Sequence, residues 1–425
     1  MTTAVSTPKD SFRLSMLVYD TRYRALTIQI VVLILFLLGV AWLVDNTITN
    51  LRAMGRTFDF GFLWNRAGYD INQRLIPYTN DSTHFRAAMV GLLNTLVVAL
   101  VGCILATVFG VMAGVLRLSN NWLVSRLMTV YVEIFRNVPL LLWILLIFVI
   151  LSETMPEAKD FRLTPEMEAQ GLQAPASMLF DGTLAVTKNG AYIPAPLLER
   201  GLGSVNLGFM SVNLTFVAIV AILAASFFVD RTVRRNAQKQ QEQTGARPKT
   251  WWKSILILFA PIVVFLIALG FHWEYPVMTR FNFSGGIQVG NPFTALTLAL
   301  ALYTGAFIAE IVRSGIMAIS RGQSEAAFAL GLRPGRTMRL IILPQALRVI
   351  IPPLISQYLN LTKNTSLAIA VSYMDLRGTL GGITMNQTGK ELECMLLMMA
   401  IYLIISLIIS TVMNIFNKAV RLKER

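Results

Sequence analysis

Long runs of apolar residues alternate along the chain with polar segments. An α-helix rises 1.5 Å per residue, so about 20 apolar residues cross the hydrocarbon core of a bilayer. The apolar runs are continuous, whereas the strands of a membrane barrel would be short and alternating. The pattern therefore predicts an all-α polytopic membrane protein with about eight transmembrane helices. The predicted spans are Ala25–Val44, Val90–Leu116, Asn137–Leu151, Leu207–Val229, Ser254–Trp273, Phe293–Val312, Val349–Val371 and Met395–Phe416.

Two of these spans contain prolines that affect their expected shape. The mildly amphipathic residues Trp122–Val132 lead into the third span, which has Pro139 near its start. The seventh span is expected to break at Pro352 and Pro353, because proline removes a backbone donor and clashes with the preceding turn. The main polar segments are residues 45–86, expected to be a loop; residues 152–206, a proline-rich external loop; and residues 230–253, a basic, glutamine-rich linker.

Composition supports a membrane protein. The 425 residues are 55% hydrophobic and only 14% charged, whereas soluble proteins carry about 25% charged residues. The two cysteines lie in or beside apolar spans, which indicates no disulfide framework. Two histidines far apart in sequence are too few for a metal site, so none is expected. Residues 1–24 lack the apolar core and cleavage site of a signal peptide, so we expect the first span to be retained as an anchor.

The net charge of +14 is explained by topology and not by nucleic-acid binding. Eight spans place both termini on one side of the membrane. The segments on that side carry 23 lysines and arginines, against 12 in the longer segments on the other side. The positive-inside rule then places both termini in the cytoplasm. It places residues 152–206 in the periplasm and residues 230–253 in the cytoplasm.

A polar and basic island, SRGQSEAAFALGLRPGRTMRLIILP, separates the sixth and seventh spans at residues 320–344. Ser320 and Gln323 have the spacing of a capping box, which would start a helix in the Ala-, Leu- and Glu-rich stretch that follows. Gly331 suits the left-handed residue after a helix end, and Pro334 suits the first turn of a second helix. The island is therefore predicted to form a short helix, a sharp turn and another helix.

The spacing of this island resembles the EAA motif of ABC-importer permeases. The alternative is an ordinary cytoplasmic loop with one helical turn. Such a loop would have no reason to match every fixed position of the EAA motif. By resemblance, Glu325, Ala326, Ala327, Gly331 and Pro344 are expected to couple the chain to an ATPase.

Other stretches resemble the polar amino-acid permease family, in its histidine/glutamine branch. The resemblance implies a type I ABC-importer permease core of five helices, formed by the second, third, sixth, seventh and eighth spans. The leading span and the inserted fourth and fifth spans resemble the long permeases of general L-amino-acid or glutamate/glutamine/aspartate/asparagine transporters. Trp143 departs from the pattern, which often has glutamine there. The stretches that carry the resemblance are Gly61–Ile71 for the long form, and Gly91–Leu116, Tyr131–Leu142, Tyr303–Pro344 and Leu361–Leu376 for the family.

This resemblance divides the chain into a permease core, a leading segment and an insert. The expected parts are a cytoplasmic N-terminal tail at 1–24, a leading helix with a periplasmic loop at 25–86, the first part of the core at 87–151, and an insert with a periplasmic loop and two transmembrane helices at 152–292. The second part of the core is expected at 293–425 and contains the EAA coupling loop, 320–344.

The resemblance implies a permease subunit of an ATP-driven amino-acid importer in the bacterial inner membrane. The sequence holds no phosphate-cradling G-x-x-x-x-G-K-S/T run, so we expect no enzyme activity and no cofactor in this chain. ATP and Mg would be held by a separate ABC ATPase dimer. Further expected partners are the lipid bilayer, a periplasmic amino-acid-binding protein and a second related permease, with a heterodimer favoured over a homodimer.

Charged side chains at membrane depth are costly and are usually paired or functional. Glu133 and Arg136 are three residues apart, and so are Glu310 and Arg313. Residues at this spacing share a helix face. We interpret both as structural or gating pairs, with the second pair anchoring the EAA loop. Substrate contact is the alternative for each.

Lys363 lies 14 residues into the seventh span, about 21 Å along a helix. Asn364, Thr365 and Ser366 follow it directly. Such a polar cluster can line a cavity, where the ammonium would meet a substrate carboxylate. The four residues are therefore candidates for the substrate pathway. A structural lysine, snorkelling or paired inside the bundle, is the alternative.

Two other classes of function are alternatives to an ABC permease. An ion-coupled secondary transporter would show inverted repeats and buried acids at the midplane, and neither is clear in the sequence. A membrane-embedded enzyme would need a constellation of histidine, serine or acidic residues at membrane depth, and no such catalytic set is present.

Overall fold

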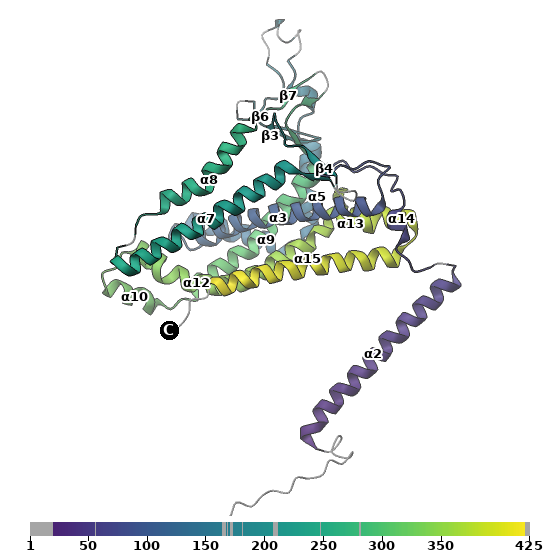
Figure 1. The fold of residues 1–425 in the computed structure, drawn as a ribbon, viewed down its shortest axis with the longest axis horizontal. Helices are drawn as coiled ribbons and strands as arrows, with labels where there is room; N and C mark the ends of the chain where they lie inside the picture. The colour runs from purple at the N-terminus through teal and green to yellow at the C-terminus, as the bar shows by residue number, and fades with distance from the viewer. Residues whose placement is uncertain are drawn as a thin grey trace, which may run out of the picture.

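The computed structural model describes residues 20–55, 57–163, 167, 169–170, 173–180, 182–206, 211–246, 248–279 and 282–420. Most of the expected N-terminal tail, 1–24, and the first four residues expected in the fourth span lie outside these residues. Within them, seven helices are long and apolar enough to cross a membrane, and a bent pair makes an eighth if it is one span. The prediction of a mostly helical, polytopic membrane protein is confirmed (Figure 1).

The long helices begin where side chains cap them. Thr83 accepts from the backbone N–H of Arg86 at 3.3 Å, and Asn213 accepts from that of Thr215 at 2.9 Å. Such caps satisfy amides that have no partner inside the helix. The helices are α2 (Thr21–Ala53), α3 (His84–Leu116), α4 (Trp122–Asn137), α5 (Leu140–Val149), α7 (Leu214–Thr244), α8 (Trp251–Ala268), α9 (Asn291–Met317), α10 (Arg321–Ala329), α11 (Pro334–Thr337), α12 (Leu343–Asn364), α13 (Leu376–Gly378), α14 (Met385–Thr388) and α15 (Glu391–Val420).

The core of the bundle is the close packing of α3 against α9. A Cβ placed on Gly110 would lie 2.5 Å from the Cβ of Ile308, and one on Gly114 would lie 2.7 Å from the carbonyl oxygen of Ala309. The two glycines, one turn apart, therefore let the helix backbones approach closely, as Gly-x-x-x-Gly pairs do in membranes. Residues from α5 and α12, such as Ile144 and Ile350, extend this core.

The third span is not one straight helix. α4 and α5 meet at an angle of 106°, with a break at residues 138–139. Asn137, expected to start the span, instead ends α4. Pro139 caps α5 and cannot donate to the turn before it. Phe135 and Trp143 stack across the bend with ring centroids 4.1 Å apart, which fixes the corner.

The expected external loop at 152–206 contains strands that pair with residues beyond the inserted helices. Its strands are β1 (Ala185–Thr187), β2 (Gly190–Ile193), β3 (Ala195–Leu198) and β4 (Ser204–Asn206). β2 pairs with β9 (Ile287–Val289), and β3 pairs with β6 (Phe271–Glu274), all antiparallel. Two further hairpins pair β4 with β5 (Ser211–Asn213) and β7 (Val277–Met278) with β8 (Phe283–Ser284). The insert therefore closes on itself above the bundle (Figure 1).

These strands correct the limits of the inserted spans. Residues 211–213, expected in the fourth span, form β5, and Phe271 to Trp273, expected to end the fifth, lie in β6. α7 also continues to Thr244, so most of the expected linker at 230–253 is helical. Its polar residues include good helix formers such as Gln, Arg and Lys, and only Gly245, at φ +74°, ends the helix.

The seventh span breaks at a different place from the one predicted. α12 continues through Pro352 and Pro353, because membrane helices can accept prolines where neighbouring groups satisfy the freed carbonyls. It ends at Asn364 and tightens into a 3₁₀ segment, Thr365–Val371. The hydroxyl of Thr365 donates to the carbonyl of Thr362 at 2.7 Å, which competes with the helical ladder.

Candidate coupling turn and polar sites

The coupling turn joins α10 to α11 at one end of the bundle, away from the strands (Figure 1). The N–H of Gly331 donates to the carbonyl of Phe328 at 2.9 Å, and that of Leu332 donates to Ala327 at 3.1 Å. This pair of bonds is a Schellman motif, which satisfies the last carbonyls of α10. The left-handed conformation expected of Gly331 is confirmed at φ +73°. Pro334 opens α11 as predicted.

α10 starts where the sequence predicted, but without the expected side-chain cap. Ser320 is the N-cap residue, but its side chain makes no capping bond, so the predicted capping box with Gln323 is wrong. The N–H of Gln323 instead donates to the backbone carbonyl of Ser320 at 3.1 Å. The helix nevertheless begins at Arg321, directly after the predicted N-cap residue.

Of the residues that carry the EAA motif, only Ala327 is buried against the bundle, and the others are exposed or half-buried. Ala327 is 1% exposed, whereas Glu325 and Ala326 are exposed. Beside them Phe328 and Leu330 present large apolar side chains, with Leu330 80% exposed. Pro344 is half-buried in the first turn of α12, behind the coupling turn. The turn therefore offers a protruding apolar surface on a short, rigid support.

The second predicted charged pair, Glu310 and Arg313, lies on α9 and faces the end of α3. Arg313 donates to Glu310 at 3.1 Å, as expected from their spacing. Glu310 also forms an ion pair with Arg117, the C-cap residue of α3, whose side chain is 8% exposed. Sequence reasoning missed Arg117, because 193 residues separate it from Glu310 and no local pattern joins them. The cluster ties α3 to α9 near the coupling end.

The first predicted pair does not form among the described residues. The side-chain amide of Asn137 donates to the carboxylate of Glu133 at 3.4 Å and to its backbone carbonyl at 2.8 Å. Arg136 lies over the ring of Phe307 on α9, 5.4 Å from its centroid. α4 packs against α9, which places Arg136 beside this ring. An aromatic face therefore takes the place of the expected carboxylate.

Lys363 and its neighbours do not share one face. The Lys363 side chain is exposed, and it has no hydrogen bond or ion pair within the part of the chain that the structure describes. Asn364 and Ser366 are half-buried. Thr365 is fully buried, with its hydroxyl 3.5 Å from that of Tyr402 on α15. Lys363 is therefore a surface cation of the single chain, whereas Thr365 holds the bundle together.

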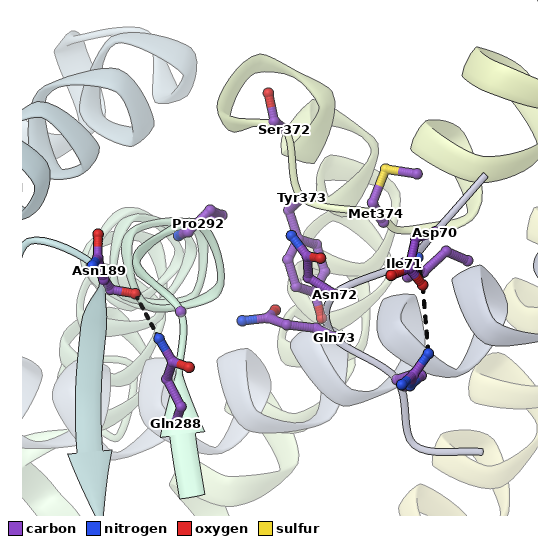
Figure 2. A pocket seen from close by; sticks show the side chains of 12 residues that line it. Asp70, Ile71, Asn72, Gln73, Asn189, Gln288, Pro292, Ser372, Tyr373 and Met374 are labelled. Atoms are coloured by element: carbon purple, nitrogen blue, oxygen red, sulfur yellow. Dashed lines mark hydrogen bonds and ion pairs between the residues drawn. The ribbon is translucent and has the colours of Figure 1, made fainter. Parts of the chain in front are cut away.

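A polar cavity of about 480 Å³ opens at the opposite end of the bundle from the coupling turn. Its walls come from the loop after α2, the sheet of the insert, the start of α9 and the turn after the 3₁₀ segment (Figure 2). Sequence reasoning missed this cavity, because the residues of its walls are distant from one another in the chain. It is lined by Asp70, Ile71, Asn72, Gln73, Arg74, Asn189, Gln288, Gly290, Pro292, Ser372, Tyr373 and Met374.

Comparison with known proteins identifies the family. Residues 251–423 match the family described as binding-protein-dependent transport system inner membrane component. The glutamate/glutamine/aspartate/asparagine transport system permease protein of Rhodobacter capsulatus is 65% identical over 426 residues, which covers 100% of both chains. The chain belongs to the permease subunits of amino-acid ABC transporters.

Two further relatives place the permease within this family. The general L-amino acid transport system permease protein of Rhizobium johnstonii is 42% identical, covering 98% of this permease and 96% of the relative. A probable glutamine ABC transporter permease protein of Bacillus subtilis is 33% identical, covering 88% of that protein but only 48% of this one. About half of this permease thus lies outside its alignment with the short relative. Nothing supports the ion-coupled alternative.

Proposed function

We propose that this permease forms the translocation path of an ATP-driven amino-acid importer and is coupled to a separate ATPase through the turn between α10 and α11. The single observation that carries the proposal is the Schellman turn at Gly331, which holds the exposed Leu330 out from the bundle. An ATPase that grips this surface would change the angle of α10 against α12. Transport would follow from a population shift between two arrangements of the bundle.

ATP and Mg would be bound by the partner ATPase dimer, since no phosphate-cradling motif occurs in this sequence. A periplasmic amino-acid-binding protein would deliver the substrate. The exposed side chain of Lys363 supports a path at the junction between two permeases, because a cation facing a second subunit is shielded from lipid. That subunit is proposed to be a second, related permease, which would make the pair a heterodimer.

The proposed orientation places the permease in the bacterial inner membrane with both termini and the coupling turn in the cytoplasm. The excess of bases on that side supports it. Single cysteines labelled from outside intact cells test it: a probe at Asn189, between β1 and β2, should react, and one at Lys239, on the polar part of α7, should not. The reverse result would invert the topology and remove the ATPase from reach of the turn.

The coupling surface is tested by co-purification with the ATPase. Leu330→Asp places a charge on the exposed apolar surface, so the ATPase should be lost while the permease remains in the membrane. Leu202→Asp, at a position 48% exposed near β4, is the matched control and should retain the ATPase. If both variants retained equal amounts of ATPase, the ATPase would not bind the permease through this turn.

The substrate class is proposed to be polar amino acids, in line with the relatives' names. Competition for uptake by acidic, amide and basic amino acids tests this directly. Inhibition by glutamate, glutamine, aspartate and asparagine is the expected result. Inhibition by neither acids nor amides would assign the permease to another substrate.

A further inference from the structure

We propose that the cavity at the sheet end is a binding site for a free α-amino acid, with Arg74 receiving its carboxylate and Asp70 its ammonium group. This inference rests on the proposed function and adds a site before the membrane path. The volume of about 480 Å³ falls within the range of about 300–1,000 Å³ typical of small-molecule sites. Its lining is polar, as a zwitterion requires.

Asp70 and Arg74 form the charged wall of the cavity, and some of their polar atoms make no hydrogen bond to the described residues. Arg74 Nη1 lies 3.5 Å from Asp70 Oδ1, a weak contact, and donates to the carbonyl of Tyr78 at 2.5 Å. Asp70 Oδ1 also accepts from the N–H of Ile71 at 2.9 Å. Within the described residues no bond occupies Asp70 Oδ2, Arg74 Nη2 or Arg74 Nε. A guanidinium with two open nitrogens matches a carboxylate, and a carboxylate oxygen matches an ammonium group.

The opposite wall supplies amide groups for the side chain of the ligand. Gln288 on β9 donates through Nε2 to the backbone carbonyl of Asn189 at 3.3 Å, which fixes its orientation (Figure 2). Among the residues that the structure describes, Gln288 Oε1 and the side-chain amide of Asn189 make no hydrogen bond. An amide carries both donors and an acceptor, so it can bond either a carboxylate or an amide. This wall therefore favours ligands with acidic or amide side chains.

A glycine allows the two walls to meet. A Cβ on Gly290, the residue before α9, would lie 2.4 Å from Nε2 of Gln73. Because Gly290 has no side chain, Gln73 can lie beside the first residue of α9. It lies there between the charged wall, Asp70 and Arg74, and the amide wall, Asn189 and Gln288 (Figure 2). Any substitution at Gly290 would push Gln73 from this place without touching either charge.

The cavity also adjoins the segment that carries Lys363. The 3₁₀ segment Thr365–Val371 leads from Lys363 to Ser372, which lines the cavity at φ +57°. A non-glycine residue in this region stores strain and marks sites where structure serves function. Tyr373, 4% exposed, anchors the turn in the core. An amino acid in the cavity would thus lie at the end of the proposed path and not inside it.

The test is calorimetric titration of L-glutamate and L-glutamine into the full-length permease in lipid nanodiscs, without the binding protein. Wild type should bind both amino acids. Arg74→Gln and Asp70→Asn should each weaken binding by about tenfold or more, since a bond to a charged group is lost. N-acetyl-L-glutamate, which lacks the ammonium group, should bind wild type as weakly as L-glutamate binds Asp70→Asn.

Arg66→Gln is the matched control, because Arg66 lies in the same loop and pairs with Asp81 at 2.7 Å, outside the cavity. It should bind L-glutamate as wild type does. Gly290→Ala provides a second variant that leaves both charges in place, and it should weaken binding by displacing Gln73. A melting temperature equal to that of wild type shows that each variant is folded.

ATP-driven uptake by the complete transporter, measured in parallel, separates this inference from the proposed function. No binding by wild type, or equal binding by Arg74→Gln and Arg66→Gln, overturns the cavity site even where uptake is normal. Loss of binding-protein docking in Arg74→Gln with unchanged amino-acid binding would assign the cavity to protein contact and also overturn it. Absence of ATP-driven uptake by wild type would overturn the proposed function instead.

Discussion

Gly331 contributes only backbone to the coupling turn. Nothing lies within 4 Å of the position that its Cβ would occupy, so space does not restrict this residue. Its φ of +73° does, because an L-residue there costs about 1–2 kcal/mol and a β-branched one is a strong outlier. The sequence predicted this conformation from the spacing alone, since a helix followed by glycine and proline has few ways to turn.

Gly331→Val should abolish uptake while leaving membrane insertion nearly normal. The turn would open, and Leu330 would lose its place relative to α12. Gly322→Ala, in a helical position of α10 with open space around it, is the control and should transport normally. Uptake near wild type with Gly331→Val, together with retained ATPase, would show that the turn conformation does not matter.

Lys363 is the residue whose role depends most on its surroundings. Its exposed side chain in the single chain disfavours the alternative of a lysine paired inside the bundle, in which an internal partner would be left unpaired. Lys363→Met should therefore leave the melting temperature of the complex unchanged and lower uptake by about tenfold, the effect of losing one bond to a charged substrate group. Lys239→Met, at an exposed position on the polar part of α7, is the control. A destabilised complex, or unchanged uptake, would contradict the pathway role.

At the scale of elements, the α3–α9 contact depends on two glycines that the sequence placed at helical spacing. Gly110→Val should lower the stability of the permease by at least about 1–3 kcal/mol, because its side chain would overlap Ile308. Gly39→Val, on the exposed helix α2 with nothing within 4 Å, should have little effect. Thermal unfolding in detergent compares the two, and equal melting temperatures would contradict close packing at Gly110.

The loop after α2 is joined to the start of α15 by a salt bridge. Lys390 Nζ lies 2.6 Å from Asp59 Oδ2, and this bond holds the pKa of Asp59 below its ordinary value of 3.8. A lowered carboxyl pKa stabilises the folded state above pH 3.8, and this stabilisation is lost as the pH falls through the folded pKa. Hydrogen exchange of residues 57–65 should therefore accelerate below pH 3.8 in wild type. Hydrogen exchange in Asp59→Asn should show no such acceleration. If its pH profile matched that of wild type, the Asp59–Lys390 salt bridge would not stabilise this loop.

The elements also show where sequence reasoning ends. Apolar length predicted the spans, because crossing lipid imposes it directly. Prolines were a less certain guide: the chain does bend at Pro139, but α12 continues through Pro352, because neighbouring helices decide whether a proline interrupts a span. Sequence reasoning did not find the pairing of β2 with β9, whose strands are separated by two long helices. Strands that are distant in sequence can pair without any local sequence pattern that predicts the pairing.

At the scale of the whole molecule, the two ends of the bundle differ in how far apart in sequence their residues lie. The coupling turn at one end lies within one continuous stretch of 25 residues, 320–344, so the spacing of its motif could be recognised in the sequence. The cavity at the other end draws Asp70, Gln288 and Ser372 from three distant segments, and only the folded chain brings them together. The glycine-packed helices α3 and α9 connect the two ends.

The most direct test of the central claim is uptake of radiolabelled L-glutamate and L-glutamine into proteoliposomes that hold the complete transporter, with its ATPase, second permease and binding protein. We predict uptake that requires ATP, persists when ion gradients are collapsed, and disappears with Gly331→Val. Uptake by the permease alone, driven by a proton or sodium gradient without ATP, would contradict the account.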